Sequence, residues 1–153
     1  MARRLEPWHE NVAKRQVKSP KIYLSDCGVL HTLLGIESRE DLLGHPKVGA
    51  SWEGFALAEV VAHVGARPEE CFFWKLHSGA ELDLFVRRGT LRRGFELKLT
   101  SSPKVTRSMR SAQETLELEE LVVVHAGGES YPLAPGIRAV GLDRLREDVA
   151  LLP

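Results

Sequence analysis

The sequence predicts an α/β domain built in layers, with a mixed central β-sheet flanked by helices. Three features carry this prediction: a helical pattern at residues 51–65, a pair of alternating strands within 80–99, and the continuous apolar run LVVVHA at 121–126. The apolar run suits a strand that is buried on both faces of a sheet. With an aromatic strand expected at 71–77 and a second helix at 103–117, the order of elements becomes α-β-β-β-α-β.

The N-terminal part of the chain carries weaker signals. Residues 1–21 contain six Lys or Arg against two Glu, and Pro7 and Pro20 interrupt regular structure. We therefore expect this segment to be a basic, partly irregular arm or the remnant of a linker. A short strand is predicted at 22–24 and a short helix at 27–35.

The limits of the longer helices are indicated by capping residues. The helix at 51–65 should begin with Ser51 as its N-cap and end near Gly65, after a loop-rich connection at 38–49. The second helix has Pro103 near its first turn, where proline is tolerated. Further expected elements are a loop at 127–136, a strand at 137–142 and a terminal helix at 143–152.

Composition bounds the possible functions. The chain has 153 residues and a formal net charge of +0, so bulk charge predicts neither nucleic-acid nor membrane binding. No apolar run reaches the roughly 20 residues that span a bilayer, and the N-terminus does not resemble a signal peptide, so we expect a cytoplasmic protein. Cys27 and Cys71 lack the paired spacing of a zinc or disulfide site. Phosphate-loop and dinucleotide-binding glycine motifs are missing from the sequence.

The two strands expected at 80–87 and 91–99 carry a charged face. Glu96 and Lys98 alternate with apolar residues and therefore share one side of their strand. On the preceding strand, Leu82 and Leu84 are expected on the apolar face and Asp83 on the opposite one. The short turn favours antiparallel pairing, which would bring Asp83, Glu96 and Lys98 together.

Such a set of residues is suited to phosphodiester hydrolysis. Two converging carboxylates repel each other unless a proton or a cation lies between them, and Mg²⁺ or Mn²⁺ prefers oxygen ligands. Lys98 could hold or help deprotonate a metal-bound water, or it could neutralise a phosphate in the transition state. The alternative interpretation is a solvated strand face stabilised by cross-strand ion pairs.

A third carboxylate lies on the first long helix. Glu53 is followed at helical spacing by Leu57, Val60 and Val64, so it belongs to the apolar stripe and should face the sheet. Burial of an unpaired carboxylate is costly, so a metal, a lysine or a hydrogen-bond donor is expected nearby. Alternatively, Glu53 only complements the helix dipole in the first turn.

Four stretches, taken in order, resemble a known group of proteins. They are VKSPKIYLSDCGVLHTLLGI, GASWEGFALAEVV, FFWKLHSGAELDLFV and GFELKLTSS. They look like the uncharacterised C-terminal domain of bacterial and archaeal AAA-type ATPases, with the pattern K-x-Y, W-E-x-F, G-x-E-V-D-F and E-V-K. More broadly, a helix with Glu followed by strands with Asp and E-x-K is similar to the PD-(D/E)XK, or restriction-endonuclease-like, superfamily. The match covers about residues 17–125.

The resemblance implies a restriction-endonuclease-like domain over residues 22–153, with a mixed sheet between helices. It implies metal-dependent phosphodiester cleavage by Glu53, Asp83, Glu96 and Lys98. The three carboxylates, with the backbone carbonyl of Leu97, would hold Mg²⁺ or Mn²⁺. The alternative that it implies is a catalytically inactive interaction or regulatory module of an AAA-type ATPase, which would act through homodimerisation.

Basic residues cluster at two places and are candidates for DNA contacts. Four arginines surround the turn between the paired strands, and three basic residues follow Lys98 at three-residue spacing, where they would form one helical ridge. The alternative is a charged turn that prevents edge pairing and a solvated helix face. The candidates are Arg87, Arg88, Arg92 and Arg93 at the turn, and Lys104, Arg107 and Arg110 on the helix.

Overall fold

A computed structural model describes residues 2–9 and 19–153. The strands are β1 (Ala2–Pro7), β2 (Lys21–Leu24), β3 (Cys71–Lys75), β4 (Glu81–Arg88), β5 (Leu91–Lys98), β6 (Glu120–His125), β7 (Tyr131–Ala134) and β8 (Ile137–Gly141). The helices are α1 (Cys27–Leu33), α2 (Arg39–Gly44), α3 (Val48–Val64), α4 (Arg107–Thr115) and α5 (Leu145–Asp148), with 3₁₀ turns η1 (Pro68–Glu70) and η2 (Leu142–Arg144).

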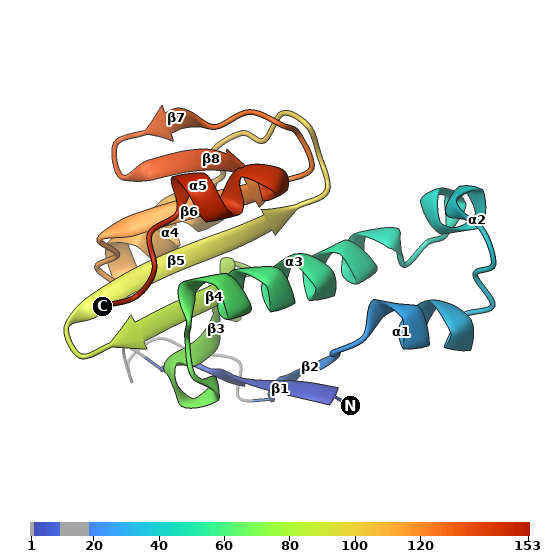
Figure 1. Cartoon of the computed structure of the whole chain (residues 1–153). Coiled ribbons are helices and arrows are strands. Elements are labelled where there is room, and N and C mark those ends of the chain that lie inside the picture. Colours follow the sequence, from blue (N-terminus) through green and yellow to red (C-terminus); the bar gives the residue numbers. More distant parts are fainter. Residues whose placement is uncertain (1, 10–18) are drawn as a thin grey trace.

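The strands form one mixed eight-stranded sheet in the order β2-β1-β3-β4-β5-β6-β8-β7 (Figure 1). β3, β4 and β5 are antiparallel neighbours, whereas β5, β6 and β8 run parallel. The succession α3-β3-β4-β5-α4-β6 confirms the predicted order of elements and the predicted α/β class with a mixed sheet. β6 is buried along most of its length, as its continuous apolar run indicated.

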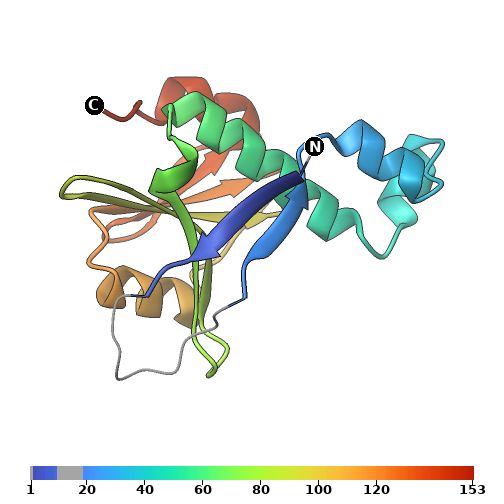
Figure 2. The same ribbon diagram turned by 90° about the horizontal axis from the view of Figure 1, so that it is seen from below.

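Helices cover both faces of the sheet. α3 and α5 lie on one face and α4 on the other, while α1, α2 and the start of α3 project past the edge as a separate lobe (Figures 1 and 2). Gly65 ends α3 with a φ of 71°, a left-handed conformation that glycine adopts without strain. None of the helices in the described part of the chain has the length and apolar character needed to cross a bilayer.

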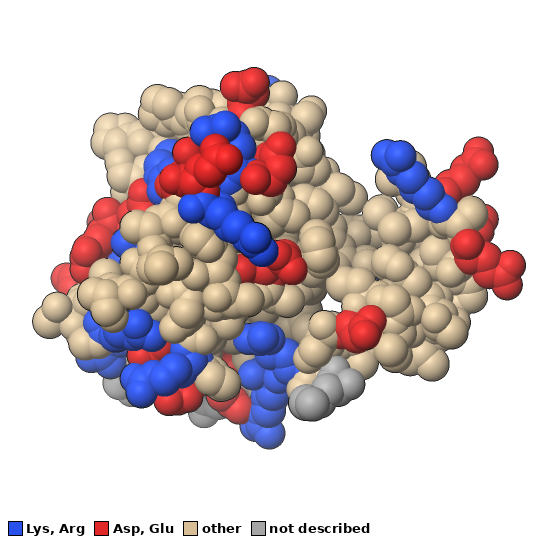
Figure 3. Space-filling view, viewed as in Figure 1, with Lys and Arg blue, Asp and Glu red and all other residues tan. Residues whose placement is uncertain are grey.

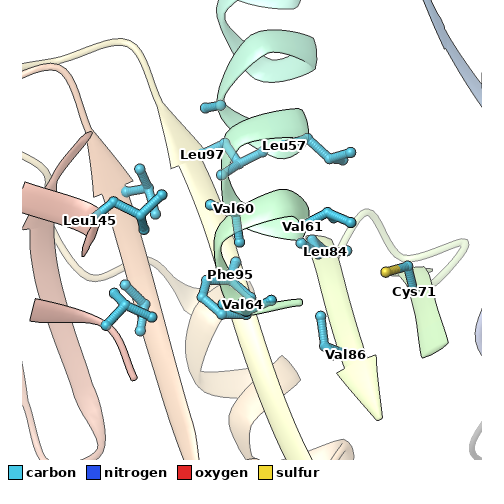
Figure 4. Close-up of a cluster of buried hydrophobic side chains, with 14 of the residues drawn as sticks. Leu57, Val60, Val61, Val64, Cys71, Leu84, Val86, Phe95, Leu97 and Leu145 are labelled. Atoms are coloured by element: carbon cyan, nitrogen blue, oxygen red, sulfur yellow. The ribbon is translucent and has the colours of Figure 1, made fainter. Parts of the chain in front are cut away.

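Each helical layer has its own hydrophobic core. On the α3 side, Leu57, Val60 and Val64 pack against Leu84 and Phe95 of the central strands (Figure 4). On the α4 side, the buried cluster is formed by residues of α4, β3, β4 and β6: Trp74, Leu82, Phe85, Met109, Ala112, Leu116, Leu121 and Val123. β4 contributes buried side chains to both cores, so it is packed on both faces.

β4 contains a bulge at Asp83 and Leu84. β3 pairs Phe72 with Phe85 and Trp74 with Leu82, so two residues of β4 face one residue of β3. The extra residue reverses the alternation, and Leu82 packs on the α4 side while Leu84 packs on the α3 side. The expectation that these two leucines share a face is therefore wrong. Bulges re-aim side chains, and this one lies at the predicted catalytic aspartate.

The segment expected as an irregular basic arm begins with a strand. β1 lies between β2 and β3 in the sheet, and Leu5 is fully buried. Trp8 follows β1 and packs edge-on against Phe72 and Phe85. Hydrophobic anchoring therefore overrides the basic composition of residues 2–9, while residues 10–18 of the expected arm lie outside the described residues.

The starts of three helices differ from the predictions for local reasons. α3 begins at Val48, and Ser51, the predicted N-cap, lies inside the helix, where its hydroxyl contacts His31 Nε2 at 2.7 Å. The expected loop at 38–49 contains α2, which Ser38 and Asp41 cap reciprocally. α4 begins after Thr106, whose hydroxyl accepts from the Met109 amide, so Pro103 precedes the helix.

β7 lies within the loop expected at 127–136. It pairs with β8 at the outer edge of the sheet, where Pro132 can be accommodated because an edge strand needs fewer ladder donors. The expected C-terminal helix is divided into η2 and the short α5. These short elements contain too few residues to show a clear period.

Candidate functional site

The end of the β4–β5 hairpin holds two buried carboxylates. Leu84 pairs with Phe95, so Asp83 near the start of β4 lies opposite the end of β5. The Leu97 amide donates a hydrogen bond to Asp83 Oδ2 at 2.9 Å. Asp83 is 5% exposed and Glu96 is 3% exposed. The hairpin therefore brings the two acids together, as predicted, although Asp83 lies in the bulge of β4, where simple alternation does not hold.

Glu96 is only partly satisfied by its neighbours. Lys98 Nζ lies 2.6 Å from Glu96 Oε1. The other oxygen, Oε2, is buried and has no hydrogen-bond partner among the described residues. A buried carboxylate oxygen without a partner is costly, so this atom needs a proton or a cation.

The pKa values of Asp83 and Glu96 are both raised above their ordinary values. Burial, together with the charge of Asp83, raises the pKa of Glu96 to about 7. Burial and the charge of Glu53 likewise raise the pKa of Asp83, against the opposing effects of the Leu97 amide and of Lys21 and Lys98. A neighbouring carboxylate thus disfavours the ionisation of each acid: Asp83 that of Glu96, and Glu53 that of Asp83. Such raised pKa values are typical of acids that share a proton or bind a metal.

Lys98 compensates part of this negative charge. Burial by itself would lower the pKa of Lys98, but the charge of Glu96 and its hydrogen bond raise the pKa above its ordinary value overall. The side chain is therefore an ammonium that donates hydrogen bonds. It remains 42% exposed, so it can also reach a molecule bound at the end of the hairpin.

Glu53 enters the site from α3. Its carboxylate accepts a short hydrogen bond from the Tyr23 hydroxyl, and Lys21 Nζ lies 3.4 Å from the same oxygen, Oε1. Burial and the contact with Glu53 raise the pKa of Tyr23 well above its ordinary value, so the phenol stays protonated and donates. The prediction that Glu53 faces the sheet and finds a donor or a lysine is confirmed.

Lys21 and Tyr23 are the site residues to which sequence reasoning gave no role. They occupy alternate positions on β2 and therefore share one face of that strand. Lys21 Nζ also lies 3.7 Å from Asp83 Oδ1 and 5.4 Å from the centre of the Phe73 ring. The signal that could have revealed them is the K-x-Y spacing just before α1, which places a cation and a phenol side by side.

The donor set is suited to a hard divalent cation, although its carboxylates are not gathered around one point. Within residues 2–9 and 19–153, no group of three His, Cys, Asp or Glu side chains lies close enough to form a ready metal cage. Instead, Lys21 lies between Glu53 and Asp83, and Lys98 contacts Glu96. The partnerless Oε2 of Glu96 and the oxygen-only chemistry of the acids fit Mg²⁺ or Mn²⁺.

A neighbouring charged pair lies at the edge of the site. Lys75 Nζ of β3 contacts Glu81 Oε2 of β4 at 2.6 Å, and both side chains are 38% exposed. This contact lowers the pKa of Glu81 below its ordinary value, although burial opposes the change. Glu81 is thus a paired surface acid and not part of the buried set.

The four arginines at the turn lie at the other end of the hairpin. Five residues of β4 separate Asp83 from Arg88, which corresponds to about 17 Å. Three of these arginines bind main-chain carbonyls: Arg88 those of Gly65 and Pro153, Arg92 that of Leu116, and Arg93 that of Ala150. Arg87 lies over the Trp8 ring at 5.2 Å. The structure thus gives these residues internal contacts and separates them from the acids.

The three basic residues after Lys98 do not form one helical ridge. Lys104 precedes α4, and only Arg107 and Arg110 lie on the helix, one turn apart. All three are exposed, on the α4 side of the sheet. Figure 3 shows the opposite face, that of α3 and α5, where acidic and basic side chains are interspersed. Contact of Lys104, Arg107 and Arg110 with nucleic acid remains a prediction.

Comparisons with known proteins identify relatives of the chain. A family model described as a domain of unknown function (DUF4143) matches residues 48–145, and another domain of unknown function (DUF8612) matches residues 1–40. Uncharacterized protein Rv2008c of Mycobacterium tuberculosis and uncharacterized protein Mb2031c of Mycobacterium bovis are each 45% identical over 145 residues. This alignment covers 95% of the chain and 32% of each relative, so the chain spans about a third of their length. No solved structure matches the chain significantly.

Proposed function

The chain belongs to the DUF4143 family, and we propose that it is a metal-dependent phosphodiester hydrolase acting on nucleic acid. The observation that carries this proposal is the buried Glu96 Oε2, which has no hydrogen-bond partner among residues 2–9 and 19–153 and lies beside a second buried carboxylate. A buried carboxylate oxygen is stabilised by a nearby cation, whereas apolar neighbours that exclude water leave its charge uncompensated.

The arrangement of elements supports a restriction-endonuclease-like fold. The order α3-β3-β4-β5-α4-β6, with helices on both faces of a mixed sheet, is the one that the resemblance to the PD-(D/E)XK superfamily implies. In that arrangement the aspartate and the E-x-K motif belong to adjacent antiparallel strands, as Asp83, Glu96 and Lys98 do. β1 and β2, which bring Lys21 and Tyr23, would then be additions at one edge of this core.

We assign the metal ligands to three carboxylates and one carbonyl. Asp83 and Glu96 would supply oxygens from the hairpin, Glu53 would supply one from α3, and the Leu97 carbonyl would complete the protein's share. A bound Mg²⁺ or Mn²⁺ would polarise a phosphoryl oxygen and make a water molecule more acidic. The sequence fits this role because all of these donors are hard oxygen ligands.

The other residues of the site would hold and orient these groups. Tyr23 donates to Glu53 and fixes the position of that carboxylate. The Leu97 amide does the same for Asp83. Lys98, which is an ammonium and partly exposed, would donate to a phosphate oxygen and offset the charge that develops on it in the transition state.

Cleavage of nucleic acid in the presence of Mn²⁺ tests this proposal. Asp83→Ala combined with Lys98→Ala should lower the cleavage rate by at least about a thousandfold, because a metal ligand and a charge-stabilising donor are both lost. Glu81→Ala is the matched control, since it removes an acid of the same hairpin that is already paired with Lys75. Cleavage that survives the double change would overturn the assignment of the site.

One observation favours a second function. Lys21 and Lys98 already accompany the three carboxylates, as expected of a site that holds its shape without a metal. The chain would then be an inactive interaction or regulatory module, whose partner would be an AAA-type ATPase or a second copy of itself. Titration calorimetry with Mn²⁺ separates the two functions: the absence of binding at millimolar metal would favour the interaction module.

A further inference from the structure

Lys21 occupies an unusual position relative to the acids. It comes from β2 at the edge of the sheet, yet its ammonium lies 3.4 Å from Glu53 Oε1 and 3.7 Å from Asp83 Oδ1. It is the lysine that joins an acid of α3 to an acid of the hairpin. The side chain is 26% exposed, so solvent reaches part of it. The ammonium can therefore move outward into solvent.

Lys98 relates to the acids in a different way. Its ammonium contacts Glu96 Oε1, while Glu96 Oε2 has no partner in the part of the chain that the structure describes. A cation on Oε2 can therefore coexist with Lys98. A cation shared by Glu53 and Asp83 would instead have to occupy the space between these two carboxylates, where the Lys21 ammonium lies.

Charge balance points in the same direction. When they are ionised, the three carboxylates together with the ammoniums of Lys21 and Lys98 leave one net negative charge. Adding a divalent ion beside both lysines would reverse that charge and place like charges about 4 Å apart, which is unfavourable in a partly buried site. Displacement of one ammonium removes this repulsion.

We propose that Lys21 is a built-in counter-ion that competes with the metal for Glu53 and Asp83. The inference rests on the proposed function, because it concerns the loading of the same site. Without metal, the Lys21 ammonium holds the two acids together. Metal binding displaces it, and Tyr23 keeps Glu53 in place because its hydroxyl donates to the same oxygen that Lys21 contacts. The displaced ammonium then remains beside the site on the short β2 strand.

The test compares Mn²⁺ affinity by titration calorimetry in the full chain and in Lys21→Met. The variant keeps the aliphatic stem but lacks the charge, so it should bind Mn²⁺ about tenfold more tightly. Lys75→Met is the matched control: it removes a strand lysine that is paired with Glu81 instead of the buried acids, and its affinity should match that of the unchanged protein. Lys21→Gln gives a second variant if Lys21→Met does not fold, which thermal melting reports.

The possible outcomes distinguish this inference from the proposed function. If the unchanged protein binds and Lys21→Met binds equally or more weakly, the metal site stands and the competition by Lys21 is wrong. If Lys21→Met alone binds, Lys21 is a complete block and the inference holds. If no variant binds at millimolar Mn²⁺, both the metal site and the competition are overturned. An equal gain in Mn²⁺ affinity in Lys75→Met would mean that the affinity depends on net charge and not on Lys21, and it would also refute the inference.

Discussion

Two buried glutamates, Glu70 and Glu96, differ in how fully their carboxylate oxygens are hydrogen-bonded. Glu70, in η1, is 4% exposed and accepts hydrogen bonds from the Arg67 amide and guanidinium and, on both oxygens, from Arg88. Glu96, on β5, is 3% exposed, yet one of its oxygens contacts the Lys98 ammonium and the other has no partner among the described residues. Two equally buried carboxylates therefore differ widely in the hydrogen bonds that they accept.

The difference separates structural from functional electrostatics. The hydrogen bonds from Arg88 and Arg67 hold the pKa of Glu70 far below its ordinary range, whereas burial and Asp83 raise that of Glu96 to about 7. The first carboxylate is stabilised in its charged form by its own fold. The second is held in a form that requires a further proton or cation, which is how binding and catalytic sites differ from scaffold ion pairs.

The largest expected effect comes from breaking the satisfied site. Arg88→Met leaves Glu70 buried with Arg67 as its remaining cation, and it also removes the contacts of Arg88 with the carbonyls of Gly65 and Pro153. We expect the melting temperature to fall by roughly 10 °C. Arg87→Met, at the exposed neighbouring position over Trp8, should lower it much less. Equal losses would show that Glu70 does not depend on Arg88.

A smaller effect, of opposite sign, is expected at the unsatisfied site. Because the folded pKa of Glu96 lies above its ordinary value of 4.5, its ionisation destabilises the fold as pH rises from about 4.5 to about 7. Glu96→Gln removes this charge and should raise the free energy of unfolding at pH 8 by about 2 kcal/mol, with little change at pH 4. Denaturant unfolding at both pH values measures the difference.

The same substitution at Glu70 provides the contrast. The pKa of Glu70 is lowered in the fold, so its charge contributes stability above its unfolded pKa and loses that contribution only in acid. Glu70→Gln should therefore destabilise the protein at pH 8, where Glu96→Gln stabilises it. Destabilisation by both substitutions at pH 8 would contradict the distinction between the two sites.

The sequence allowed the central part of this site to be predicted because local rules determine it. The short turn pairs the two strands, alternation places Glu96 and Lys98 on one face of β5, and helical spacing turns Glu53 inward. These are consequences of periods of two and 3.6 residues. The same rules predicted α3 and the hairpin, which are long enough to show their periods, whereas β6 was predicted from its continuous apolar run. The position of Asp83 depends in addition on the bulge in β4.

Features set by tertiary packing could not be predicted in this way. Lys21 reaches Glu53 across 32 residues of sequence, because β2 pairs with β1 at the sheet edge and β1 itself was expected to be irregular. The bulge that separates Leu82 from Leu84 arises from pairing with β3, which no pattern within β4 reveals. The arginines at the turn have internal partners for the same reason, since these partners lie on distant segments.

The smallest effect on stability is expected at the exposed cations of α4. Arg107→Glu combined with Arg110→Glu should change the melting temperature by no more than about 2 °C, because both side chains are exposed. If these arginines contact phosphates, the double change should weaken DNA binding and reduce the slope of log K against log salt by about one for each lost contact. Fluorescence anisotropy at several salt concentrations measures both quantities.

A charge-matched variant makes this last experiment decisive. Arg39→Glu combined with Arg146→Glu alters net charge equally, at exposed positions on α2 and α5. If α4 forms the contact surface, this variant should retain more of the DNA affinity and of the salt slope than the α4 variant. Equal losses would mean that DNA affinity depends on net charge alone and that Arg107 and Arg110 form no specific contact surface. Unchanged binding in both variants would move the predicted DNA contact to the lysines beside the buried acids.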